Sequence, residues 1–139
     1  MNIGNTAPKF TVPNHNGEEV SLSDFKGKWI ILYFYPKDNT PRCTIEAIDF
    51  TARKKDFEKL NAIVLGVSKD SPKSHCNFIE KQNLTIILLS DEEKNVQQLY
   101  EAWGQKKFMG REFMGTLRST VLIDPNGRIA YHWQNVKAK

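Results

Sequence analysis

Four segments of the chain are apolar without the polar alternation of a half-buried strand. They are Trp29–Tyr35, Ala62–Val67, Thr85–Leu89 and Thr120–Ile123. Continuous apolar runs of this length are typical of strands that helices cover on both faces. The pattern therefore predicts a central sheet built from these four segments.

Three helices are predicted between these strands, over about Pro41 to Leu60, about Pro72 to Asn83 and about Glu92 to Tyr100. Ser71 and Asp91 are the N-cap candidates of the second and third helices, because their side chains can accept hydrogen bonds from the first turn. Pro72 suits the first helical position, where its missing N–H costs nothing. Helices that alternate with strands indicate an α/β fold with a mixed central sheet flanked by helices.

Two turn signals complete this outline. Asp-Pro-Asn-Gly at 124–127 predicts a reversal into an antiparallel strand over about 128–133, and Asn16-Gly17 predicts an N-terminal hairpin. We expect a single domain over residues 1–139. Residues 136–139 follow the last strand directly, so we expect the C-terminal helix of such a domain to be missing through truncation or disorder, or replaced by a partner.

Composition narrows the function classes. The chain has 139 residues, 40% of them hydrophobic and 26% charged, as in soluble globular proteins. It contains neither an apolar run of roughly 20 residues nor a signal peptide, so we expect a cytoplasmic location and no membrane contact. The net charge is +4, but lysines and arginines are interleaved with acidic residues. This distribution favours solvated helix faces over a nucleic-acid site.

Cys43 is the most informative residue, and it is one of only two cysteines. If Thr40 is the N-cap and Pro41 the first helical residue, Cys43 takes the third helical position. The unpaired N–H groups and the dipole of a helix start stabilise a thiolate. An inert buried thiol is the simpler alternative. The placement of Cys43 favours a reactive sulfur.

Other chemistries have less support. Thr40 stands where a Cys-x-x-Cys dithiol would need its first cysteine, and no glycine-rich phosphate loop occurs. The histidines, His15, His75 and His132, are too scattered for a zinc site. Spacing alone leaves a Cys–His protease open, without local support. We expect no metal and no organic cofactor.

The segment around Cys43 resembles a known family. Pro36, Thr40 and Cys43 match the Pro-x-x-x-Thr/Ser-x-x-Cys signature of peroxiredoxins. The flanking YFYPKDNTP, the segment GVSKDSPKSHCNFIEKQNL and a later Arg-Ser-Thr are similar to the bacterioferritin comigratory protein branch, also called peroxiredoxin Q. The resemblance covers nearly the whole chain. It implies a thioredoxin-like fold and the reduction of hydrogen peroxide and organic hydroperoxides.

The resemblance also implies roles for individual residues. Cys43 would be the peroxidatic cysteine, whose thiolate attacks a peroxide oxygen and becomes a sulfenic acid. The Thr40 hydroxyl and the N–H groups of the helix start would hold the peroxide, and Pro36 would shield the pocket. Arg118 would stabilise the thiolate and the leaving oxygen. Glu46, one helical turn after Cys43, either orients Arg118 or is solvated.

The sequence departs from the branch at two positions. Ile48 stands where many members carry a resolving cysteine, and Arg42 stands where glycine is common. Arg42 either adds a cation near the sulfur or points into solvent. Some members place the resolving cysteine in the helix that here contains Cys76, so we favour an intramolecular Cys43–Cys76 disulfide. Because a disulfide needs Cα atoms within about 7 Å, the first turn around Cys43 would have to unravel.

Alternatives remain for the catalytic cycle. The leading hypothesis is an enzyme that thioredoxin or a similar dithiol protein recycles. If Cys76 is an inert core thiol, the protein is a one-cysteine peroxidase that an external thiol reduces. The alternative from another function class is a non-catalytic peroxide sensor. A monomer is expected for this branch, with a dimer as the alternative. Trp103 and Phe108 are expected to pack in a core or an interface.

Overall fold

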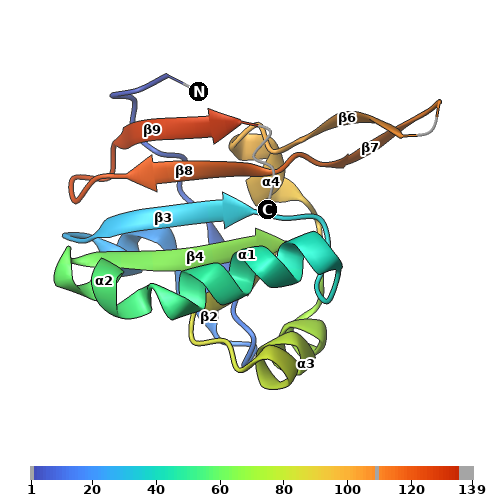
Figure 1. Ribbon diagram of the computed structural model, residues 1–139. Helices are drawn as coiled ribbons and strands as arrows, with labels where there is room; N and C mark the ends of the chain where they lie inside the picture. The colour runs from blue at the N-terminus through green and yellow to red at the C-terminus, as the bar shows by residue number, and fades with distance from the viewer. Residues whose placement is uncertain (1, 109, 135–139) are drawn as a thin grey trace.

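A five-stranded mixed sheet forms the centre of the computed structural model, which describes residues 2–108 and 110–134 (Figure 1). The strand order is β5-β4-β3-β8-β9. The strands are β3 (Trp29–Phe34), β4 (Ala62–Ser68), β5 (Ile87–Ser90), β8 (Ser119–Ile123) and β9 (Ile129–Gln134). β3, β4 and β5 run parallel, while β8 is antiparallel to both β3 and β9. The predicted mixed sheet and the antiparallel final strand are confirmed.

The helix predicted over 41–60 is wrong as a single element. The structure has α1 (Pro41–Ala52) and α2 (Lys54–Lys59), separated by Arg53. Arg53 has φ −100° and ψ 8°, and it serves as the C-cap of α1 and the N-cap of α2. The apolar period continues through this break, so the periodicity alone did not reveal it.

The second predicted helix is confirmed as α3 (Pro72–Gln82). The Ser71 hydroxyl accepts a hydrogen bond from the Ser74 N–H at 3.2 Å, and Asn83 ends the helix in the left-handed conformation with φ 55°. The third helix is shorter than predicted. α4 spans only Asn95–Leu99, after Lys94 in the left-handed conformation, although the Asp91 carboxylate still accepts from the Gln97 N–H at 2.8 Å.

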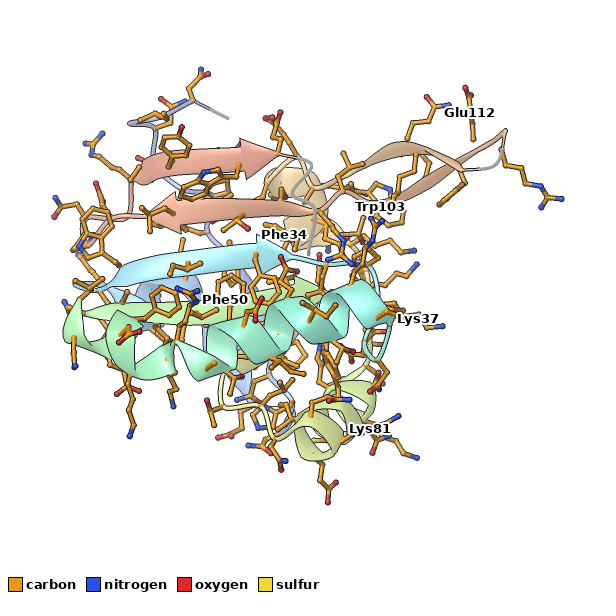
Figure 2. All side chains as sticks on the ribbon, in the orientation of Figure 1. Phe34, Lys37, Phe50, Lys81, Trp103 and Glu112 are labelled. Atoms are coloured by element: carbon orange, nitrogen blue, oxygen red, sulfur yellow. The ribbon has the colours of Figure 1, made fainter. Side chains whose placement is uncertain are left out.

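Two hairpins lie outside the central sheet. The predicted N-terminal hairpin is confirmed as β1 (Thr11–Pro13) and β2 (Glu19–Ser21), followed by the 3₁₀ turn η1 (Leu22–Phe25). A second hairpin, β6 (Trp103–Phe108) with β7 (Arg111–Thr116), was not predicted. It projects from the body of the molecule in Figure 1, and Glu112 lies out on it in Figure 2. Its strands mix polar and apolar residues and lack the continuous apolar runs of the central ones.

Trp103 and Phe108 were predicted to pack in a core or an interface. Trp103 is only partly buried, and the ammonium groups of Lys94 and Lys69 lie 5.2 and 6.0 Å from its ring centroid. The ring therefore packs beside cations at the base of the hairpin rather than in the core. The side chain of Phe108 lies outside what the structure describes.

β3 divides the interior into two cores. Ile30, Leu32 and Phe34 belong to the core on one face of the sheet, whereas Tyr33 and Tyr35 belong to the core beneath α1. α1 lies across this second face in Figure 1. The alternation follows from the period of two in a strand. The core beneath α1 also contains Cys43, so β3 supports the candidate site from below.

Within residues 2–108 and 110–134, no helix is long and apolar enough to cross a membrane. The expectation that a C-terminal helix is missing concerns residues 136–139, which lie outside the described residues.

Candidate active site

Cys43 lies at the third position of α1, with Thr40 as the N-cap and Pro41 as the first helical residue. β3 delivers the chain into the loop that precedes this helix, and Lys37 marks that loop in Figure 2. Cys43 is only 1% exposed and packs in the core beneath α1. The sulfur therefore sits at a helix start, where N–H groups favour negative charge, and is shielded from bulk water.

Arg118 connects Cys43 with Glu46. It lies directly before β8, and its Nη2 donates to Cys43 Sγ at 2.9 Å. Its Nη1 donates to Glu46 Oε1 at 3.2 Å, and both side chains are nearly buried. Glu46 therefore lies against the guanidinium and is not solvated. The structure brings these three predicted site residues together, although Arg118 is 75 positions from Cys43 in the chain.

Burial shapes the charges around this cluster. Burial raises the pKa of Glu46 to about 7, and the Arg118 guanidinium opposes part of that rise. Burial also lowers the pKa of Lys106, in β6, with Arg118 adding to the shift and Cys43 opposing it. Lys106 therefore shares the electrostatic environment of the site. Lys106 could not be predicted as a neighbour of the site, because nothing in the spacing of the chain connects the hairpin to Cys43.

Thr40, Pro36 and Arg42 surround the helix start in different ways. The Thr40 hydroxyl donates to the Lys37 carbonyl at 2.8 Å and makes no cap hydrogen bond to the helix. Pro36 is partly buried, while the Arg42 side chain is exposed. The Thr40 hydroxyl thus braces the loop in this structure, and Arg42 adjoins Cys43 in sequence without being buried beside it.

Cys76 is not turned toward the core that contains Cys43. Its thiol donates to the His15 carbonyl in the N-terminal hairpin at 2.9 Å, and both cysteines are free thiols. Ile79, one turn later in α3, packs against the core beneath α1. Cys76 itself is not part of that core.

A buried polar network adjoins the site and was not predicted. Asp38, in the loop before α1, accepts hydrogen bonds from the hydroxyls of Tyr35 and Ser74 at 2.6 and 2.8 Å. His75 Nδ1 lies 2.7 Å from the same carboxylate. His75, weighed above only as a zinc ligand, is thus a member of this network. Among the described residues, no group of three or more His, Cys, Asp or Glu side chains could hold a metal ion.

Comparisons with known proteins agree with this geometry. Residues 3–132 match the model of the AhpC/TSA family. The chain is 48% identical to peroxiredoxin Bcp of Bacillus subtilis over 139 residues, which are 100% of this chain and 88% of that protein. It is 39% identical to peroxiredoxin Bcp of Escherichia coli over 137 residues, 99% of this chain and 88% of the relative.

Solved structures give the same result. The crystal structure of a Xylella fastidiosa PrxQ mutant superposes with a TM-score of 0.94 at 38% identity, covering 100% of this chain and 89% of that one. The Xanthomonas campestris bacterioferritin comigratory protein superposes with a TM-score of 0.88 at 37% identity, covering 93% and 82%. The thioredoxin-like fold of this chain is that of these proteins. The chain belongs to the AhpC/TSA family, in the bacterioferritin comigratory protein or peroxiredoxin Q branch, and is a thiol-dependent peroxidase.

Proposed function

We propose that Cys43 is the peroxidatic cysteine and that Arg118, Glu46, Thr40 and Pro36 form its pocket. The observation that carries this proposal is the 2.9 Å contact from Arg118 Nη2 to Cys43 Sγ at a helix start. The thiolate attacks one peroxide oxygen, the O–O bond breaks, and the leaving oxide takes a proton from water. The sulfur is oxidised to sulfenic acid, and the peroxide is reduced to water or an alcohol.

The substrates that we propose are hydrogen peroxide and organic hydroperoxides. The structural study of the Xanthomonas campestris relative concerns its alkyl peroxide reduction activity, which supports the organic class. In this chain, Arg118 faces the sulfur and can stabilise the charge on the leaving oxygen. The N–H groups at the start of α1 supply further donors without any metal.

A trapping experiment tests the role of Cys43. Reduced protein is mixed with hydrogen peroxide or cumene hydroperoxide in the presence of dimedone, and the modified residue is located by mass spectrometry. We expect the adduct on Cys43, and we expect Cys43→Ser to abolish peroxide consumption while Cys76→Ser retains the first oxidation. Dimedone on Cys76 alone, or an active Cys43→Ser variant, would overturn the assignment.

We also propose that Cys76 resolves the sulfenic acid. Its thiol would displace water from the Cys43 sulfenic acid to form a disulfide, which thioredoxin or a similar dithiol would then reduce. The polar network supports this route, because Asp38 lies five residues before Cys43 and contacts His75, the neighbour of Cys76. Unwinding of these residues would free a segment of five residues that spans at most about 17 Å.

A one-cysteine cycle is the second candidate, and a specific observation favours it. The Cys76 thiol is held by the His15 carbonyl, so it would have to leave this hydrogen bond before it could attack. An external thiol would then form a mixed disulfide with Cys43, and a second thiol would release it.

Thiol counting separates the two cycles. One equivalent of peroxide is added to the wild type and to Cys76→Ser, and free thiols are counted. Loss of both thiols in the wild type supports the Cys76 cycle, whereas survival of the Cys76 thiol supports the one-cysteine cycle. Absence of turnover with thioredoxin, glutaredoxin or small thiols would favour a peroxide sensor. The cytoplasmic location and the monomeric state stay predictions.

A further inference from the structure

Asp38 and His75 form a buried pair that joins the loop before α1 to α3. His75 is fully buried, and its Nδ1 lies 2.7 Å from Asp38 Oδ2. Its other ring nitrogen, Nε2, lies 3.0 Å from the Leu89 carbonyl oxygen in β5. A carbonyl oxygen only accepts hydrogen bonds, so Nε2 must carry a hydrogen. His75 therefore ties the loop, α3 and the sheet to one another.

Asp38 has hydrogen-bond partners besides His75. Its side chain accepts from the hydroxyls of Tyr35 and Ser74, and the main-chain N–H of Asp38 donates to Asp70 Oδ2 at 2.8 Å. The contact between Asp38 Oδ2 and His75 Nδ1 therefore belongs to a buried network of side-chain hydrogen bonds. Removal of either partner leaves a buried polar group without its hydrogen bond.

The loop itself has few other anchors. Lys37 and Asn39, on either side of Asp38, are exposed, and Asn39 has φ 62°. Asp38 is only 5% exposed. It is therefore the buried attachment point of the loop whose next residues begin α1 and present Cys43.

We propose that Asp38 and His75 are positioning residues for the chemistry of Cys43. The pair holds the loop and the first turn of α1 closed, so that the sulfur stays shielded and aligned with Arg118. The pair also determines how readily this turn opens when a thiol must reach the oxidised sulfur. This role rests on the proposed function of Cys43. Neither Asp38 nor His75 is proposed to contact the peroxide or the sulfur.

The test measures opening and catalysis separately. In His75→Asn, we expect alkylation of Cys43 by a bulky maleimide under native conditions to accelerate about tenfold. We expect kcat/KM for hydrogen peroxide to fall by about tenfold, as for a displaced reacting group. Amide hydrogen exchange should accelerate in residues 41–45 and stay unchanged in β3 and β4.

A matched control separates positioning from general destabilisation. Phe10→Leu weakens the core on the opposite face of the sheet, and both variants are assayed at temperatures equally far below their own unfolding midpoints. Only His75→Asn should expose Cys43 selectively. Equal alkylation of Cys43 in the two variants would overturn the proposal.

A second variant keeps the test valid if His75→Asn does not fold. Asp38→Asn is nearly isosteric and should also accelerate alkylation of Cys43. If the pair acts as one unit, the double variant is no worse than either single one. If the effects of the two substitutions on the alkylation rate multiply in the double variant, the two residues do not act as one unit. Alkylation needs no peroxide, so failure here is distinguishable from failure of the peroxidatic role, which dimedone trapping on Cys43 tests independently.

Discussion

Arg118 donates to Cys43 Sγ with one end of its guanidinium and to Glu46 with the other. The planar guanidinium therefore has a fixed orientation relative to the Cys43 sulfur. Because the carboxylate occupies Nη1, Nη2 remains aimed at Cys43. A fork of this kind is a property of arginine that lysine does not share.

Replacement of this fork should slow the oxidation step. We expect Arg118→Met to lower kcat/KM for hydrogen peroxide roughly a hundredfold, the usual cost of losing one donor to developing negative charge. Arg118→Lys should recover only part of the loss, because it cannot contact Cys43 and Glu46 together. Stopped-flow mixing of reduced protein with peroxide measures the rate. Arg111→Met, at an exposed position of β7, is the control and should match the wild type.

The raised pKa of Glu46 predicts a pH dependence of stability. With a folded pKa of about 7 and an ordinary value of 4.5, the folded protein keeps a proton that the unfolded chain has lost. The free energy of unfolding should therefore fall as pH rises from about 4.5 to 7, by at most about 3 kcal/mol.

Glu46→Gln removes this titration. Urea unfolding of the wild type and the variant between pH 4.5 and 8 measures the difference. The variant should gain stability relative to the wild type across that window. If the two proteins show parallel pH profiles, Glu46 is ionised throughout and the assigned shift is wrong.

The Thr40 hydroxyl should matter for the geometry of the loop. Thr40→Val removes the hydrogen bond to the Lys37 carbonyl, and we expect about 1 kcal/mol less stability, as for the loss of one net hydrogen bond. Peroxide reduction should slow as well, because the loop that this hydrogen bond braces leads directly into the turn of α1 that contains Cys43. Thr40→Ser keeps the hydroxyl and should behave nearly as the wild type. Thermal unfolding and steady-state peroxide consumption measure both effects.

Gly66, in β4, leaves no room for a side chain beside the ring of Tyr33. A Cβ at this position would lie 2.8 Å from Tyr33 Cζ and 2.9 Å from Leu88 Cδ2. Both side chains are fully packed, so Gly66→Ala should destabilise the protein by about 1–3 kcal/mol. Chemical denaturation measures the change. Gly104→Ala, where the nearest atom is Leu117 Cδ1 at 3.1 Å, is a milder comparison, and equal effects of the two would contradict the argument.

Local signals predicted much of the fold. The four apolar runs became strands, and Ser71 with Pro72 marked the start of α3. The break at Arg53 and the hairpin of β6 and β7 were missed. The hairpin segment has no proline and no strong hydrophobic period, and the apolar period of the first helix runs on through Arg53. Tertiary packing rather than local preference therefore determines both features.

The candidate site likewise has one part that local sequence patterns predict and another part that they do not. Thr40, Pro41 and Cys43 are adjacent in sequence, so their arrangement could be predicted from helix capping alone. The contact between Asp38 and His75 joins positions 37 residues apart, and no local pattern reveals it. Arg118 was assigned through family resemblance, since its spacing from Cys43 carries no physical signal.

The near-complete burial of Cys43 has a consequence for selectivity. A compact –OOH head needs far less room to reach the sulfur than a folded protein or a bulky disulfide does. Oxidants are thus sorted by size before their affinity matters. The same barrier would face a macromolecular reductant, so a catalytic round that uses one would have to include a brief opening that brings the oxidised sulfur to the surface.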